Sequence, residues 1–123
     1  PHYVVFVDNA DAVAIVEEAR KIRYNERFKS EGINVNFVQV LNDNEIYVRT
    51  YERGVEDETL SCGTGVVASV LAFIAKKQSS SQEIGVKTKG GNLSVKFTKT
   101  ETQFTGVWLT GPAVKVFEGS VEL

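Results

Sequence analysis

The pattern of hydrophobic and polar residues predicts strands and helices along most of the chain. The run Tyr-Val-Val-Phe-Val within residues 2–8 is β-branched and aromatic, which predicts a buried strand. Apolar residues then recur over residues 12–23 at the spacing of one helical face. Residues 63–77 are apolar on nearly all sides, which predicts a second helix buried inside the fold.

The remaining segments alternate as strands do. Residues 33–41 and 45–52 form two such runs, and the polar residues between them predict a hairpin turn. We expect a loop over residues 53–62 and a tight hairpin turn at Gly90 and Gly91. The last strand-like runs cover residues 83–89, 92–98, 103–110 and 113–123. The order β-α-β-β-α-β-β-β-β predicts an α+β fold, in which a mostly antiparallel sheet wraps around one buried helix.

Composition and charge narrow the class of protein. The 123 residues carry no repeat and no shift in composition, so we expect one domain. A net charge of −2 argues against a nucleic-acid partner. The longest uncharged apolar run, residues 65–75, is shorter than the roughly 20 residues of a membrane span, and no signal-like segment opens the chain. One cysteine suits a cytoplasmic location, and the absence of methionine leads us to expect a piece of a longer protein.

The segment with most chemical information is Ser-Cys-Gly-Thr-Gly at residues 61–65. It places the only cysteine, Cys62, at the start of the predicted buried helix. Unpaired amides and the positive end of the helix dipole favour a thiolate there, and the same amides suit a carboxylate or phosphate. Gly63 and Gly65 would let the backbone approach a ligand closely. The alternative is that Cys62 is an inert core residue beside a glycine-rich turn.

Polar residues elsewhere are candidates for the same site. Glu52 and Arg53 end a predicted strand, where they would relay a proton and bind a carboxylate, or else form a surface ion pair. His2, the only histidine, suits proton transfer near neutral pH, or is simply exposed at the chain end. Asn34 and Asn36 share one face of a strand, and nothing local decides between ligand recognition and an edge or turn role.

The sequence lacks the residues that several other chemistries require. One histidine and one cysteine cannot build a structural zinc site of the usual kind. The sequence contains no Walker A motif and no dinucleotide-binding fingerprint. We therefore expect no metal and no cofactor.

Six short blocks, taken together, resemble the diaminopimelate epimerase family. They are Pro-His at residues 1–2, Ile-Asn-Val-Asn-Phe at 33–37, Glu-Arg-Gly at 52–54, Cys-Gly-Thr-Gly at 62–65, Gly-Gly-Asn-Leu at 90–93 and Leu-Thr-Gly-Pro-Ala at 109–113. The blocks run in the family's order along the whole chain. One departure lies at residues 52–59, where Glu-Arg-Gly-Val-Glu-Asp-Glu-Thr is one residue longer than the family's usual Glu-Arg-Gly-x-Gly-Glu-Thr and lacks its second glycine.

The resemblance implies a fold and an activity. Residues 1–123 would form a single lobe, the C-terminal half of a two-lobed protein whose N-terminal lobe this chain lacks. The family interconverts LL- and meso-diaminopimelate without a cofactor, on the route to lysine and peptidoglycan, and one cysteine from each lobe moves the α-proton. The implied partners are diaminopimelate, the N-terminal lobe and a second copy in a homodimer, without nucleic acid or membrane.

The resemblance also assigns roles to individual residues. Cys62 resembles the catalytic cysteine of the C-terminal lobe, and His2 and Glu52 resemble the residues that assist proton transfer. The substrate-binding positions are Asn34, Glu52, Arg53, Gly63 and Thr64. Because this chain supplies one cysteine, we expect it to be inactive alone.

Two alternatives remain beside the epimerase. A proline racemase-like enzyme also carries Cys-Gly-Thr-Gly, but usually after Asp-Arg-Ser-Pro, whereas Thr-Leu-Ser precedes Cys62 here. The other alternative is a non-catalytic binding lobe in which Cys62 is buried and inert.

Overall fold

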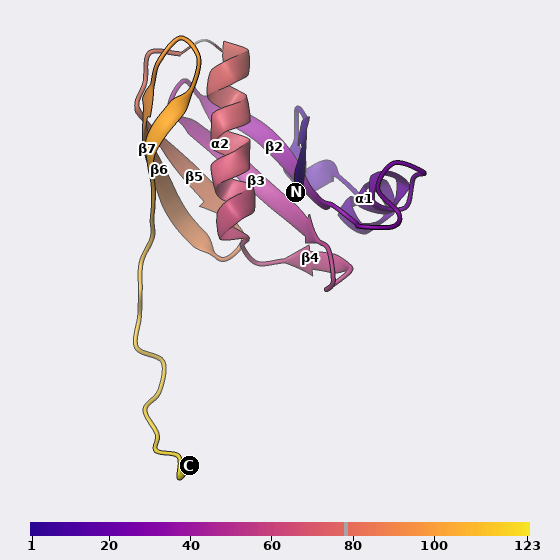
Figure 1. Cartoon of the computed structure of the whole chain (residues 1–123), viewed down its shortest axis with the longest axis vertical. Coiled ribbons are helices and arrows are strands. Elements are labelled where there is room, and N and C mark those ends of the chain that lie inside the picture. Colours follow the sequence, from indigo (N-terminus) through magenta and orange to yellow (C-terminus); the bar gives the residue numbers. More distant parts are fainter. Residues whose placement is uncertain (78) are drawn as a thin grey trace.

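One curled sheet and two α-helices make up the fold, which a computed structural model describes over residues 1–77 and 79–123 (Figure 1). The strands are β1 (His2–Phe6), β2 (Asn34–Asn42), β3 (Glu45–Glu52), β4 (Asp57–Thr59), β5 (Glu83–Thr88), β6 (Gly91–Lys99) and β7 (Phe104–Thr110). The helices are a short 3-10 turn, η1 (Ala10–Ala12), and two α-helices, α1 (Ile15–Arg23) and α2 (Gly63–Lys77).

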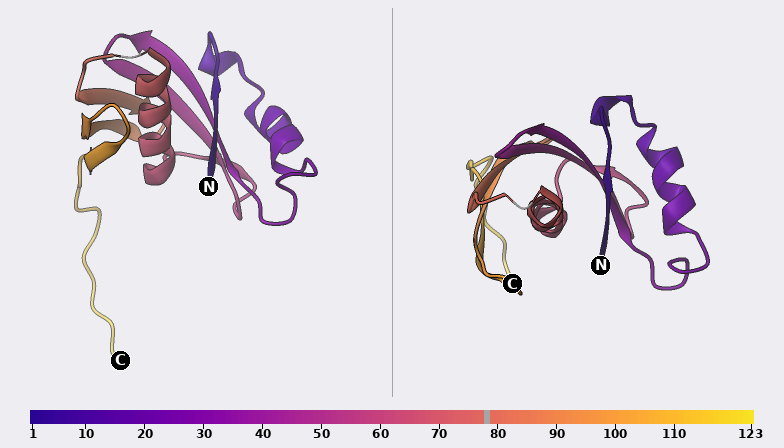
Figure 2. Two further views of the ribbon diagram at one scale, coloured as in Figure 1. Left: turned by 45° about the horizontal axis from the view of Figure 1, so that its top comes forward. Right: turned by 90° about the horizontal axis from the view of Figure 1, so that it is seen from above.

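The sheet runs in the order β1-β2-β3-β5-β6-β7, and β4 pairs with β3 beside this path. Two of its pairs, β1 with β2 and β3 with β5, are parallel, and the other four are antiparallel. Seen from above, the sheet curls around α2, while α1 lies on the opposite side of β1 and β2 (Figure 2). The α+β prediction of a mostly antiparallel sheet around one buried helix is confirmed.

The main core lies between α2 and the concave face of the sheet. Val66, Val70, Phe73 and Ile74 of α2 are at most 1% exposed, and they pack against apolar residues of β2, β3, β5 and β6. This burial explains why α2 is apolar on nearly every side. Among residues 1–77 and 79–123, no helix is long and apolar enough to cross a membrane.

A second, smaller core lies under α1 and begins later than the sequence pattern predicts. Ile15 and Ala19 of α1 are buried against β2 and against Tyr51 of β3. The predicted helix over residues 12–23 is wrong at its start, because the chain first makes the 3-10 turn Ala10–Ala12 and α1 begins at Ile15. Arg49 explains the delay, since its Nη1 donates to the carbonyls of Ala10 and Val13 at 2.6 and 3.2 Å.

The loop predicted over residues 53–62 contains a strand. Asp57–Thr59 forms β4 and pairs antiparallel with the end of β3, opposite Thr50, Tyr51 and Glu52. The hairpin turn predicted at Gly90 and Gly91 lies one residue earlier, because Thr88 pairs with Gly91 and leaves Lys89 and Gly90 between the strands. Gly91 takes a φ of +138°, which favours glycine at that position.

The strand predicted over residues 113–123 is wrong. After β7 the chain leaves the sheet as an extended tail (Figure 1), and the side chains of Val114, Val116, Phe117 and Val121 are at least 80% exposed. A strand needs a neighbouring strand for its backbone hydrogen bonds. Within the described residues β7 pairs with β6 alone, so the tail finds no such neighbour.

Candidate active site

The N-terminus of α2 positions the cysteine. The amide of Val66 donates to the carbonyl of Cys62 at 2.8 Å, so Cys62 is the N-cap residue of the helix. The next amides, those of Gly63, Thr64 and Gly65, lie in the first helical turn, where no earlier turn exists to accept them. The half-buried Cys62 thiol therefore lies beside backbone donors and the positive end of the helix dipole.

His2, Thr64 and Cys62 form a short hydrogen-bonded chain, although 62 residues separate the first two. His2 Nε2 lies 2.9 Å from Thr64 Oγ1, and Thr64 Oγ1 lies 3.6 Å from Cys62 Sγ. Strand β1 pairs with β2, and the start of β1 lies near the N-terminus of α2. This pairing brings His2 into position. The arrangement connects the imidazole to the thiol through one hydroxyl group.

The ends of β1, β2 and β3 gather the other predicted site residues. His2 pairs with Asn34 in the sheet, and Glu52 ends the strand on the other side of β2. The Arg53 amide donates to Asn34 Oδ1 at 2.8 Å, and Arg53 Nη1 donates to the Glu31 carbonyl at 2.8 Å. Among the described residues no ion pair joins Glu52 to Arg53, so the surface ion-pair alternative does not hold for these two.

The turn after Arg53 is held by Glu56. Its backbone has a φ of +57°, a value that residues other than glycine rarely adopt. Its amide donates to the Glu52 carbonyl at 2.8 Å. The carboxylate accepts from Arg23 Nε and Nη2 at 3.0 and 2.9 Å and from the Tyr51 hydroxyl at 2.9 Å. Burial opposes ionisation, but these donors and the amide of Gly54 lower the pKa of Glu56 to about 2. The longer loop thus has a fixed path, clamped to α1.

A second clamp holds the segment that leads to Cys62. Arg49 binds Glu58 with two hydrogen bonds, from Nε at 2.7 Å and from Nη2 at 2.8 Å. Lys89 donates to the same carboxylate at 2.8 Å. The hydrogen bonds from Arg49, and then from Lys89, lower the pKa of Glu58 despite its burial. The two pairs fix β4 to β3 and to the β5–β6 turn.

The later sequence blocks lie against the same end of α2. The Gly90 amide donates to the carbonyl of Leu60 at 2.8 Å, two residues before the cysteine. A Cβ atom on Gly63 would lie 3.0 Å from Leu109 Cδ2, so β7 also approaches the start of α2 closely. Blocks that are far apart in the sequence therefore meet at one place in the fold.

Asn36 is a polar residue of β2 for which the local sequence favours no single role. It is fully buried, and its side chain contacts His2, the Tyr3 carbonyl and Thr50. Gly65 makes this possible, because a Cβ there would lie 2.4 Å from Asn36 Oδ1. Besides the predicted close approach of a ligand to the backbone, Gly65 leaves space for the Asn36 side chain. The available signal was a polar residue between the apolar Val35 and Phe37.

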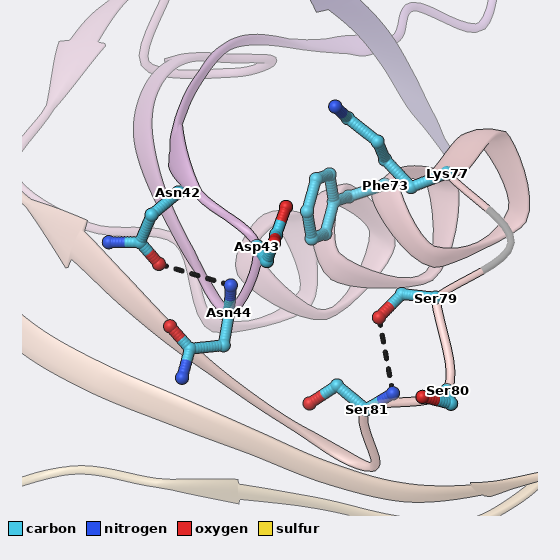
Figure 3. Close-up of a pocket in the computed structure, with 8 residues that line it drawn as sticks. All are labelled: Asn42, Asp43, Asn44, Phe73, Lys77, Ser79, Ser80 and Ser81. Carbon is cyan, nitrogen blue, oxygen red and sulfur yellow. Dashed lines mark hydrogen bonds between the residues drawn. The ribbon is translucent and has the colours of Figure 1, made fainter.

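Another polar depression lies far from this cluster. It is lined by the β2–β3 turn and by Phe73, Lys77, Ser79, Ser80 and Ser81 at the other end of α2 (Figure 3). The 15 residues of α2 span about 22 Å, so this depression is remote from Cys62. In the described part of the chain, no three His, Cys, Asp or Glu side chains group as metal ligands would.

Sequence comparisons place the chain among known proteins. The family model described as "Diaminopimelate epimerase" matches residues 1–116. Over 98% of its length the chain is 43% identical to a diaminopimelate epimerase from Flavobacterium psychrophilum, and over 100% it is 50% identical to one from Archaeoglobus fulgidus. The chain covers 47% and 41% of these two proteins, so it spans less than half of each relative.

Solved structures with the same fold share little sequence with the chain. One is a phenazine biosynthesis protein of the PhzF family from Enterococcus faecalis. The match covers 85% of this chain and 35% of that protein, with a TM-score of 0.60 and 15% identity. Another is a predicted epimerase from Pseudomonas aeruginosa. That match covers 82% of this chain and 34% of that protein, with a TM-score of 0.59 and 12% identity. These likenesses extend to the fold alone.

Proposed function

This chain belongs to the diaminopimelate epimerase family, and we propose that it forms one wall of an active site that interconverts LL- and meso-diaminopimelate. In this proposal residues 1–123 are the C-terminal lobe, and an N-terminal lobe supplies the opposite wall with a second cysteine. The contact chain from His2 through Thr64 to Cys62, at the N-terminus of α2, is the observation that carries the proposal.

Inversion at the α-carbon needs a base on one face and an acid on the other. Cys62 is the only thiol of the chain, so it serves one face as thiolate base or thiol acid. His2 assists proton transfer by Cys62 through the hydrogen bonds of Thr64, and Glu52 at the end of β3 assists as a neighbouring carboxylate. A single cysteine leaves this lobe inactive alone.

Substrate binding in the proposal falls to the start of α2 and the ends of β2 and β3. An α-proton becomes more acidic when the neighbouring carboxylate is neutralised, and the Gly63 and Thr64 amides are donors for that purpose. Arg53 and Asn34 bind the polar groups of the substrate, with Arg53 already held by Asn34 and Glu31. No cofactor takes part in this chemistry.

The exposed apolar tail supports the need for a second lobe. Residues 113–123 carry strand-like apolar side chains that find no partner in the described residues. In the proposal the tail pairs with the N-terminal lobe, and the complete protein acts in the cytoplasm as a homodimer. The family match favours diaminopimelate over the proline racemase-like alternative.

Proton–deuterium exchange at the α-carbon of LL-diaminopimelate in heavy water tests the proposal. We expect exchange by a complete two-lobed protein that contains this chain, loss of exchange in Cys62→Ala, and no exchange by the chain alone. Proline serves as the control substrate and should not exchange. Exchange with inversion by the isolated chain would overturn the two-lobe proposal, and full activity of Cys62→Ala would favour the non-catalytic alternative.

A further inference from the structure

The side-chain amide of Asn36 has only one orientation that satisfies its neighbours. The Tyr3 carbonyl can only accept a hydrogen bond, and it lies 3.3 Å from Asn36 Nδ2. The Thr50 hydroxyl lies 2.9 Å from Asn36 Oδ1, where it donates. The NH2 group therefore occupies the position next to Tyr3, and its second hydrogen points at His2 Nδ1, 3.3 Å away.

This orientation decides where His2 carries its proton. A neutral imidazole has one N–H donor and one acceptor nitrogen. Because Nδ1 faces the donor Nδ2 of Asn36, Nδ1 must be the acceptor and the proton must be on Nε2. His2 Nε2 then donates to Thr64 Oγ1 at 2.9 Å, which leaves the hydroxyl hydrogen of Thr64 free to point at Cys62 Sγ, 3.6 Å away.

We propose that Asn36 is a positioning residue that holds His2 as the neutral Nε2–H tautomer, so that every donor in the chain from Asn36 to Cys62 points toward the sulfur. In the opposite tautomer the Thr64 hydroxyl would donate to His2, and its oxygen would accept from the Cys62 thiol. Asn36 thus selects the direction that stabilises a thiolate. Its significance for proton transfer rests on the proposed function, whereas the tautomer itself does not.

The surroundings keep both residues in this state. Asn36 is fully buried, and the missing side chain of Gly65 leaves space for its oxygen. Burial lowers the pKa of His2, the Glu52 carboxylate opposes this shift, and the positive charge of Arg53 adds to it. A doubly protonated ring would also place an N–H against the Asn36 NH2 group, so the neutral form is favoured twice.

Because His2 is the only histidine, one labelled sample reports the tautomer without ambiguity. Long-range proton–nitrogen correlation spectra of the chain with 15N-labelled histidine separate a pyrrole-like from a pyridine-like ring nitrogen. We expect pyrrole-like Nε2 and pyridine-like Nδ1 at neutral pH. Pyrrole-like Nδ1, or a rapidly averaged pair, in the unmodified chain would overturn the proposal without any variant.

The variant Asn36→Asp tests the cause. A carboxylate at this position accepts a hydrogen bond from Nδ1, so we expect Nδ1 to become protonated and the His2 pKa to rise. The control Asn44→Asp makes the same chemical change at an exposed turn and should leave the His2 spectrum unchanged. An unchanged tautomer and pKa in a folded Asn36→Asp chain would contradict the proposal.

The two proposals fail separately. If the tautomer is Nε2–H but a complete protein with this chain does not exchange the α-proton of diaminopimelate, the proposed function is wrong and the role of Asn36 in orienting His2 stands. If exchange occurs and the tautomer is Nδ1–H, the proposed function stands and the role of Asn36 is wrong.

Discussion

Arg49 and Glu58 are joined by two parallel hydrogen bonds of 2.7 and 2.8 Å, and the pair links the centre of the sheet to the segment that leads to the cysteine. Both side chains are well shielded, with 8% and 14% exposed. The Arg49 guanidinium also holds two carbonyls at the start of the α1 region. Arg49 therefore fixes the two segments that lead into α1 and α2.

Removing the Glu58 carboxylate should lower the stability of the fold substantially. In Glu58→Gln the Arg49 charge stays buried without its partner, and we expect the free energy of unfolding to fall by about 3–5 kcal/mol. Urea unfolding followed by circular dichroism measures the change. Glu83→Gln is the matched control, because its pair with Lys96 is exposed and 3.7 Å long, and it should change stability little. Equal losses in the two variants would contradict this prediction.

The stability of the chain should depend on pH through Glu56. Its pKa is lowered from 4.5 to about 2 in the folded chain, so the folded state keeps this carboxylate ionised where the unfolded state protonates it. The contribution of Glu56 is therefore fully present above pH 4.5 and is lost as the pH falls toward about 2. Urea midpoints measured across this window should decrease less steeply in Glu56→Gln. An equally steep decrease in the variant would refute the assignment.

A methyl group at residue 65 should disturb the site through Asn36. In Gly65→Ala the new Cβ would lie 2.4 Å from Asn36 Oδ1, so either the buried amide or the helix must move. We expect a loss of about 1–3 kcal/mol in unfolding free energy and a shifted His2 resonance. Gly119→Ala is the control, because nothing lies within 4 Å of that position. If Gly65→Ala is as stable as the control, the packing around Asn36 is looser than described.

The thiol should respond to the hydroxyl between it and His2. Thr64→Val removes the group 3.6 Å from Cys62 Sγ, and we expect native alkylation of Cys62 by iodoacetamide to slow by up to about tenfold. Thr64→Ser keeps the hydroxyl and should react at nearly the original rate. Equal rates in all three proteins would show that Thr64 does not assist the thiolate.

Deleting residues 113–123 should leave the fold of the remaining chain intact. The tail side chains are exposed and belong to neither core, so the urea midpoint should not change. Light scattering should report less self-association, because exposed apolar side chains such as Phe117 promote contact between copies. A lower midpoint in the shortened chain would mean that the tail packs on the rest of the fold in solution.

The parts of the fold that the sequence predicts are those that depend on local periodicity. The apolar run of α2 and the alternation in β2 and β3 report burial directly, so these elements were predicted within a residue or two. The late start of α1 and the strand β4 depend on Arg49, which binds the Ala10 carbonyl, 39 residues away, and the Glu58 carboxylate, on a different strand. The strand predicted over the tail is wrong because an alternating pattern indicates strand propensity only. It does not show whether the chain contains a neighbouring strand to pair with.

The same division applies to the site. Cys62 and the glycines stand at a helix start that a single sequence can reveal, and Glu52 and Arg53 end a visible strand. The link from Asn36 to His2 depends on the parallel pairing of β1 and β2, which no local pattern encodes. The packing of Gly65 against Asn36 is equally hidden, since only the folded structure shows which side chain fills the space beside that glycine.

The sheet order also determines when the site forms during folding. The hydrogen bond between His2 and Thr64 closes a loop of 62 residues, and β1 must first cross over to lie parallel to β2. Closing long loops costs chain entropy before any contact compensates for it, so non-local contacts of this kind form slowly. The hairpin of β2 and β3 needs only a two-residue turn and can assemble early. The imidazole should therefore reach the thiol among the last events of folding, after the core that supports both is in place.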